Sequence, residues 1–158
     1  MPSLIISRTR DYAATLFSTT YDKLDFTNTF PSTAKATFSA GQIDGFPILA
    51  NGLKVDGSVG VNILTITNVQ NYQTLAPTSW TFTNWAASDR VEFYGTVGND
   101  SLRGASPLAD FVYGGTGNDM LITDDGTDRL YGGDGNDTFF SYNSDGAMFF
   151  GGLAMMSF

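Results

Sequence analysis

The fold is decided by three near-copies of one short sequence: GTVGNDSLR (95–103), GGTGNDMLI (114–122) and GGDGNDTFF (132–140). Looser copies lie between and after them: GASPLADFVY (104–113), TDDGTDRLY (123–131) and SYNSDGAMF (141–149). The eighth place of each unit is apolar, with spacings of 10, 9, 9, 9 and 9 along the series Leu102, Val112, Leu121, Leu130, Phe139 and Met148. A fixed period of this length predicts a stack of short coils.

Glycines at the first, second and fourth places explain how so short a unit can form a coil. They permit backbone angles closed to other residues, so six residues can form a tight loop with bared carbonyl groups. The last three residues then form a short strand whose eighth side chain points inward. Two units make one coil, with a loop on each edge.

The sixth place holds an aspartate in five of the six units. Loops that stack on each other are two units apart, so Asp100, Asp119 and Asp137 share one edge, and Asp110 and Asp128 share the other. The sixth unit breaks this pattern, because Asp145 and Gly146 are out of register.

The spacing of stacked loops suits calcium. Coils in a parallel stack lie about 4.8 Å apart. Calcium holds oxygen ligands at about 2.3–2.6 Å, so two oxygens on opposite sides of the ion are separated by a similar distance. We therefore predict Ca²⁺ between adjacent loops of the first edge. The second edge is less suited, because ASPLAD (105–110) lacks the glycines and contains Pro107.

The units GTVGNDSL, GGTGNDML and GGDGNDTF resemble the RTX, or hemolysin-type, calcium-binding repeat family. The resemblance implies a right-handed parallel β-roll and export by a type I secretion apparatus under an uncleaved C-terminal signal. It also implies that the sixth-place aspartates bind calcium together with loop carbonyl groups. By position, these carbonyl groups are those of Gly95, Gly98, Gly114, Gly115, Gly117, Gly132, Gly133 and Gly135.

Composition predicts an all-β protein and excludes several functions. Strand-forming residues are plentiful, whereas Glu92 is the one glutamate. Cysteine and histidine are absent, which removes disulfides, thiolate or imidazole zinc sites and histidine-based catalysis. Residues 95–158 hold nine aspartates and two arginines out of a total net charge of −8, so we expect cation binding and no nucleic-acid partner.

Residues 1–94 are expected to form a β-rich lead-in or cap, and residues 95–158 the repeat array. Strands are expected at Lys54-Val55, Val61–Thr67, Trp80–Phe82 and Val91–Phe93. No linker-like composition separates the two parts, so we expect the lead-in to cap or extend the same stack. Trp80, Phe82, Trp85 and Phe93 are interpreted as core or cap residues rather than a sugar-stacking platform.

The first function hypothesis is a non-enzymatic calcium-binding module whose folding is driven by the metal, in a secreted, extracellular protein. No catalytic residue and no organic cofactor site is expected. Asp89 and Glu92, three residues apart on a strand, point to opposite faces and do not form a hydrolytic pair. The N-terminal residues do not resemble a cleavable signal peptide, and no segment is expected to insert in a membrane.

Two alternatives remain open. One is a secreted adhesin or carbohydrate-binding surface protein that uses the aromatic or threonine face of residues 40–94 to bind a glycan. The other is a fragment of a longer RTX exoenzyme, because residues 154–158 are a short tail after the last repeat.

Overall fold

The computed structural model describes residues 3–6, 10–11, 23–26, 33–39, 54–57, 60–70, 80–105, 108–142 and 146–151. Within these ranges the secondary structure consists of strands and turns, with no helix, which confirms the all-β prediction. Ser106, Pro107, Asp145 and residues 154–158, on which some of the expectations rest, lie outside the described residues.

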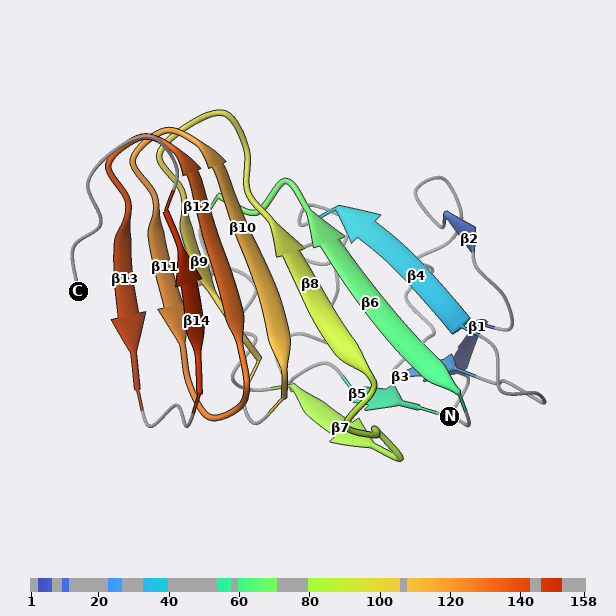
Figure 1. The fold of residues 1–158 in the computed structure, drawn as a ribbon. Helices are drawn as coiled ribbons and strands as arrows, with labels where there is room; N and C mark the ends of the chain where they lie inside the picture. Colours follow the sequence, from blue (N-terminus) through green and yellow to red (C-terminus); the bar gives the residue numbers. More distant parts are fainter. Residues whose placement is uncertain are drawn as a thin grey trace.

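The strands alternate along the chain between two sides of a flattened coil (Figure 1). Strands with odd numbers lie on one side: β1 (Ser3–Ile6), β3 (Lys23–Phe26), β5 (Lys54–Asp56), β7 (Thr81–Thr83), β9 (Ser101–Arg103), β11 (Met120–Thr123) and β13 (Thr138–Ser141). Strands with even numbers lie on the other: β2 (Arg10–Asp11), β4 (Thr33–Ser39), β6 (Val61–Thr67), β8 (Arg90–Tyr94), β10 (Asp110–Thr116), β12 (Arg129–Asp134) and β14 (Met148–Phe150).

The even strands form one seven-stranded sheet, in the order β14-β12-β10-β8-β6-β4-β2. The odd strands form two shorter sheets, β1-β3-β5-β7 and β13-β11-β9. The recorded strand pairs are parallel, and the two strands of each pair are two places apart along the chain. This is the topology of a stack of two-stranded coils, as in a β-roll.

The seven-stranded sheet runs through the point where the repeats begin. β8 belongs to the lead-in, and it pairs on one side with β6 and on the other with β10, a strand of the array. The coils on the two sides differ in length. Asn62 and Asp89 occupy matching places 27 residues apart, whereas Asp119 and Asp137 are 18 residues apart. The longer lead-in coils therefore add connecting residues without changing the sheet.

A single core fills the space between the sheets. The eighth-place residues Leu102, Val112, Leu121, Leu130 and Phe139 are buried in it, together with Leu64, Ile66, Val91 and Phe93 of the lead-in. The prediction is wrong for Met148, which is 44% exposed. Leu130 pairs with Phe149 instead, because the last coil contains one more residue before its strand.

The structure has strands at all four upstream places expected from the sequence. Trp80 and Phe93 are buried in the core, and Phe82 and Trp85 pack against it, so these aromatic residues are structural. Thr65 is also buried, and its hydroxyl group donates a hydrogen bond to Glu92 at 3.0 Å.

Charged groups of the lead-in find partners within the protein. Glu92 is 4% exposed and accepts hydrogen bonds from Lys35 Nζ at 3.1 Å and Arg90 Nε at 2.8 Å. Burial alone would raise the pKa of Glu92, but the contacts with Arg90, Lys35 and Thr65 outweigh it and lower the pKa below its usual value. Glu92 is therefore charged in the folded lead-in without help from a metal.

The Glu92→Gln variant should be less stable than the wild type at neutral pH, by on the order of 1 kcal/mol. Because the folded-state pKa of Glu92 is lowered, its contribution is present above the unfolded-state pKa and is lost as the pH falls through the folded-state pKa. The difference in unfolding free energy between the two proteins should therefore shrink as the pH falls from 7 toward 3. Denaturant titrations at several pH values, at constant calcium, measure it; a difference independent of pH would contradict this role.

Candidate metal centre

The aspartates of the first edge form a ladder of hydrogen bonds. The backbone N–H of Asp100 donates to Oδ1 of Asp119 at 2.9 Å, and the N–H of Asp119 donates to Oδ1 of Asp137 at 3.0 Å. The backbone continues the pairing, because the Asp119 carbonyl oxygen accepts from the N–H of Thr138 at 2.8 Å. All three carboxylates are buried, with at most 4% exposed. Each aspartate thus joins its own coil to the next.

The asparagine before each aspartate forms a second ladder in the opposite direction. The N–H of Asn118 donates to Oδ1 of Asn99, and the N–H of Asn136 donates to Oδ1 of Asn118, both at 2.7 Å. The aspartate side chains reach back to the preceding coil, and the asparagine side chains reach forward to the following one. Sequence analysis missed this role, although the repeated Asn-Asp pair was its signal.

The glycines of the first edge stack directly on oxygen atoms. Gly115, Gly117, Gly133 and Gly135 all have positive φ, between 102° and 130°. A Cβ atom at any of them would clash with a carbonyl oxygen of the preceding coil: that of Thr96, Gly98, Gly115 or Gly117, in the same order. A Cβ at Gly114 or Gly132 would clash with Oδ2 of Asp119 or Asp137, and one at Gly95 with the carbonyl oxygen of Gly114. The predicted glycines therefore lie together, in loops lined with oxygen.

Two carboxylate oxygens of this edge, Asp119 Oδ2 and Asp137 Oδ2, are buried without a hydrogen-bond partner among the described residues. Burial is the main cause that raises the pKa of Asp119, and the neighbouring carboxylates of Asp137 and Asp100 add to it. The Oδ2 oxygen of Asp100 has hydrogen-bond partners, because Thr96 donates to it both its backbone N–H, at 2.5 Å, and its hydroxyl group. Buried, unpartnered carboxylate oxygens among bared carbonyl groups are what a hard cation requires.

The second edge has the same kind of rung. The N–H of Asp110 donates to Oδ1 of Asp128 at 2.8 Å, and the N–H of Ala105 donates to Oδ2 of Asp110. Burial raises the pKa of Asp128 to about 7 and that of Asp110 well above its usual value, with the charge of Asp128 adding to the shift at Asp110. Although ASPLAD lacks the glycines, its aspartate holds the ladder position.

The described residues contain no group of three or more acidic or histidine side chains close enough to share a metal ion. A cation in these loops would therefore take one or two carboxylate oxygens and complete its ligands with backbone carbonyl groups, a mixture that calcium accepts. Two carbonyl groups that sequence analysis did not name lie in these positions, those of Thr96 and Leu108. Leu108 faces Gly126 of the next coil.

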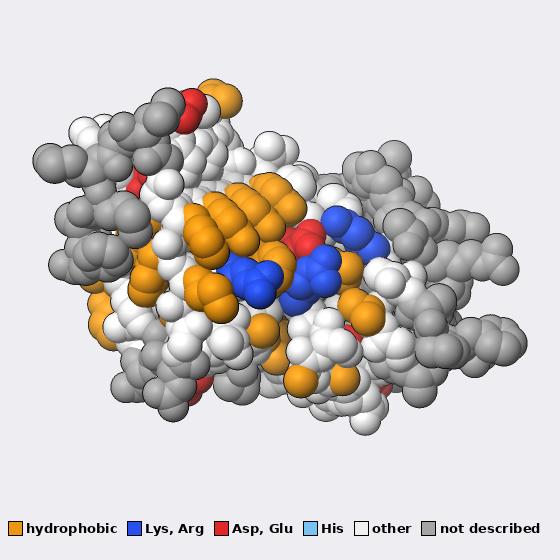
Figure 2. Space-filling model, in the orientation of Figure 1, with side chains coloured by type: hydrophobic (Ala, Val, Ile, Leu, Met, Phe, Trp, Pro, Cys, Tyr) orange, Lys and Arg blue, Asp and Glu red, His pale blue; other side chains and the backbone are white. Residues whose placement is uncertain are grey.

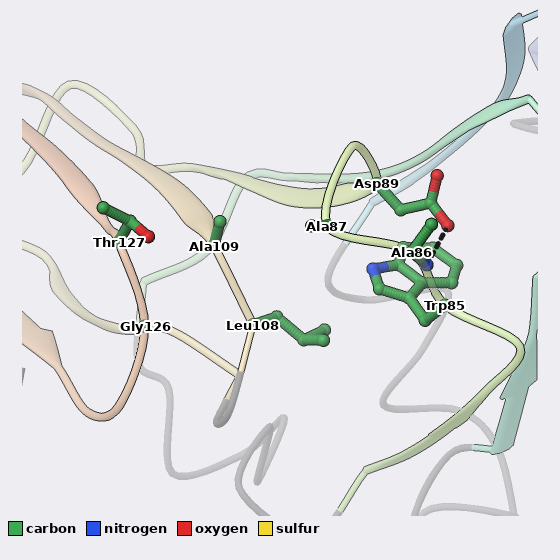
Figure 3. Close-up of a pocket in the computed structure, with 8 residues that line it drawn as sticks. All are labelled: Trp85, Ala86, Ala87, Asp89, Leu108, Ala109, Gly126 and Thr127. Atoms are coloured by element: carbon green, nitrogen blue, oxygen red, sulfur yellow. Dashed lines mark hydrogen bonds between the residues drawn. The ribbon is translucent and has the colours of Figure 1, made fainter.

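A cavity of about 350 Å³ lies beside the second edge, lined by Trp85, Leu108, Gly126 and Thr127 among others (Figure 3). Asp89 borders it, but its carboxylate accepts the N–H of Ala86 and two hydrogen bonds from Asn62, at 2.8–3.0 Å. Glu92 makes its contacts with Lys35, Arg90 and Thr65 instead. The two carboxylates share none of these partners.

A parallel stack of coils with aspartate ladders on both edges is the architecture of a cation-binding β-roll. Residues 105–139 match the family model of the RTX calcium-binding nonapeptide repeat, with four copies. The chain therefore carries RTX repeats, and repeats of this family bind Ca²⁺. The unit 95–103 lies before the matched residues, yet Leu102 pairs with Leu121 as part of the same sheet. No curated protein and no solved structure matches the chain.

Replacing Gly133 by alanine tests the close stacking of the loops. Its positive φ and the carbonyl oxygen of Gly115 leave no room for a methyl group, so Gly133→Ala should cost about 1–3 kcal/mol of stability and weaken calcium binding. Gly98→Ala is the matched control, because the nearest atom to its Cβ would be Thr96 Oγ1 at 3.7 Å. Thermal unfolding in saturating calcium compares the two; equal losses would show that loop contact does not decide the effect.

Proposed function

We propose that the protein is a calcium-binding module in which the ions lie between the stacked loops and hold the coils together. The observation that carries this proposal is the pair of buried, unpartnered oxygens, Asp119 Oδ2 and Asp137 Oδ2, within glycine loops of the RTX type. Calcium would supply a positively charged partner for these two carboxylates. Asp100, Asp119 and Asp137 would hold it on the first edge, with carbonyl groups of Thr96, Gly98, Gly115 and Gly117.

The second edge would hold calcium through Asp110 and Asp128. Burial raises the pKa of both carboxyl groups, and a bound cation would offset the cost of burying their charge. The carbonyl group of Leu108, which faces Gly126, would contribute a further oxygen.

The role of the metal follows from the contrast between the two parts of the chain. In the lead-in, Glu92 and Asp89 are buried but fully partnered by Lys35, Arg90, Asn62 and backbone N–H groups. In the array, the carboxylates of Asp100, Asp119 and Asp137 stack on one another with no basic partner among the described residues. We therefore expect the array to fold only with calcium, whereas the lead-in coils hold together without it.

Proteins with RTX repeats are typically extracellular, where calcium is plentiful, and metal-dependent folding suits such a location. Export in an unfolded state through a type I secretion apparatus, followed by folding outside the cell, is the route that this proposal favours. The described residues contain no helix that is long and apolar enough to cross a membrane.

Asp119 should matter to two ions, because it takes part in two rungs of the first ladder. Asp119→Asn should lower the number of calcium ions bound by at least one and weaken the remaining first-edge site by about tenfold or more. Asp134→Asn removes the same charge from an exposed position of the next loop on the same edge, and should bind as many ions as the wild type. Isothermal titration calorimetry gives both the number and the affinity; unchanged binding by Asp119→Asn would refute this assignment.

Removing calcium should unfold the chain in part. Hydrogen exchange followed by mass spectrometry should show a large loss of protection in strands β9 to β14 with a chelator present. Strands β4, β6 and β8 should keep most of their protection, because their buried charges are paired. Equal protection of both parts with and without the chelator would contradict metal-dependent folding.

A further inference from the structure

The outer face of the seven-stranded sheet carries rows of side chains aligned across the coils. Residues of β8, β10 and β12 that alternate with the core residues Val91, Phe93, Val112 and Leu130 point to this face. One row contains Glu92, Phe111 and Arg129, which are neighbours in the strand register. Figure 2 shows a band of hydrophobic side chains and a cluster of Lys and Arg side chains next to each other at the centre of this face.

This face carries a row of four stacked aromatic rings: Tyr94, Tyr113, Tyr131 and Phe150. The centroids of successive rings are 4.5, 4.8 and 4.6 Å apart, and the planes of neighbouring rings are tilted by 9° or less. Because the rings cover one another's flat faces, the row offers ring edges and phenol groups to a ligand. Burial, followed by the neighbouring Tyr94 and Tyr131, raises the pKa of Tyr113 to about 12, so its phenol stays a neutral hydrogen-bonding group.

Beside this row, two guanidinium groups stack on one phenylalanine. Arg90 and Arg129 lie 5.2 and 5.1 Å from the centroid of the Phe111 ring. Arg90 also pairs with Glu92, as does Lys35, at 2.8 and 3.1 Å. Arg129 is exposed, and among the described residues no ion pair is recorded for it. Two cations thus pair with one carboxylate, and a third, Arg129, stacks on the same ring as Arg90, on a protein whose net charge is −8.

We propose that this face binds an acidic polysaccharide, with its carboxylate groups on Arg129 and Arg90 and its hydroxyl groups along the tyrosine row. Guanidinium groups held in place by an aromatic ring are well suited to carboxylates, because they offer paired N–H donors in a fixed plane. The row of phenol groups repeats from coil to coil, so it suits an extended polymer of repeating units. Phe111 and Arg129 directly follow Asp110 and Asp128 of the second edge, but their side chains lie on the outer face of the sheet, whereas the two carboxylates are buried in the loops.

The charge of the protein favours this polymer over the other polyanions. A nucleic-acid duplex carries one phosphate charge per about 1.7 Å, and the surplus of aspartate in the array would repel so dense a charge. A neutral glycan would use the phenol groups but leave the exposed guanidinium without a partner. A polysaccharide of uronic acids carries one carboxylate on each sugar ring, fewer charges per length than a duplex, together with many hydroxyl groups.

The test compares short oligogalacturonates with their methyl esters, which are neutral but otherwise the same, by isothermal titration calorimetry on the calcium-loaded protein. The wild type should bind the acid form at least tenfold more tightly than the ester. Arg129→Gln should weaken binding by about fivefold to tenfold, the loss of one charge-assisted contact. The matched control is Lys54→Gln, which removes the same charge from an exposed position on β5, in the opposite sheet, and should bind within twofold of the wild type.

Several outcomes would overturn the proposal. They are no binding of the acid form, equal binding of acid and ester by the wild type, or equal losses in Arg129→Gln and Lys54→Gln. Tighter binding of oligothymidylate than of oligogalacturonate would assign the face to nucleic acid instead. Calcium binding by Arg129→Gln should stay that of the wild type, so a failure of this proposal is distinguishable from a failure of the calcium sites.

Discussion

The array depends on one interaction, the hydrogen bond from the backbone N–H of one aspartate to the side chain of the aspartate one coil further on. It fixes the register of neighbouring coils and, at the same time, buries a row of carboxylates with like charges on top of each other. A parallel ladder of backbone bonds could hold the strands, but it would not bring carboxylate oxygens into the loops. The same contact therefore builds the stack and creates its demand for a cation.

The two parts of the chain meet the cost of buried charge in different ways while they share one sheet. In the lead-in, the backbone N–H of Asn62 donates to Oδ1 of Asp89, as that of Asp110 does to Asp128, and the Asn62 carboxamide donates a second hydrogen bond to Oδ2 of Asp89. In the array, Asp110 holds the place that corresponds to Asn62, and its carboxylate has no hydrogen atom to donate. The strand β8 of the lead-in thus gives the array a neighbouring strand, because β10 pairs with it.

Much of the array was predictable because its period is short and its chemistry is repeated. The pairing of Asp100 with Asp119 and Asp137, and of Asp110 with Asp128, follows from counting two units per coil. The pattern fails at Met148, because one extra residue moves Phe149 into the core, and a nine-residue count carries no signal of that shift. The carbonyl groups of Thr96 and Leu108 were missed because the place of a carbonyl oxygen in a loop depends on backbone direction and not on residue type.

The lead-in was harder to predict because its coils are long and have no repeated motif. The positions of its strands followed from alternating apolar residues, but their partners did not, since matching residues of paired strands are between 20 and 31 apart and the connections differ. The aromatic row was also invisible, although Tyr113 and Tyr131 occupy the same place in their units. Tyr94 and Phe150 complete it from outside the regular count.

The two opposed ladders restrict how such a sequence can change over generations. The asparagine side chain contacts the following coil and the aspartate side chain contacts the preceding one. A residue inserted between an asparagine and its aspartate would therefore break contacts on both sides, whereas coils of 19 and 18 residues both keep the two ladders. Whole coils, by contrast, contact only their immediate neighbours, so one can be duplicated or deleted and the remaining ends still fit. The array is therefore free to vary in length by complete turns, while the length of each turn is held nearly constant.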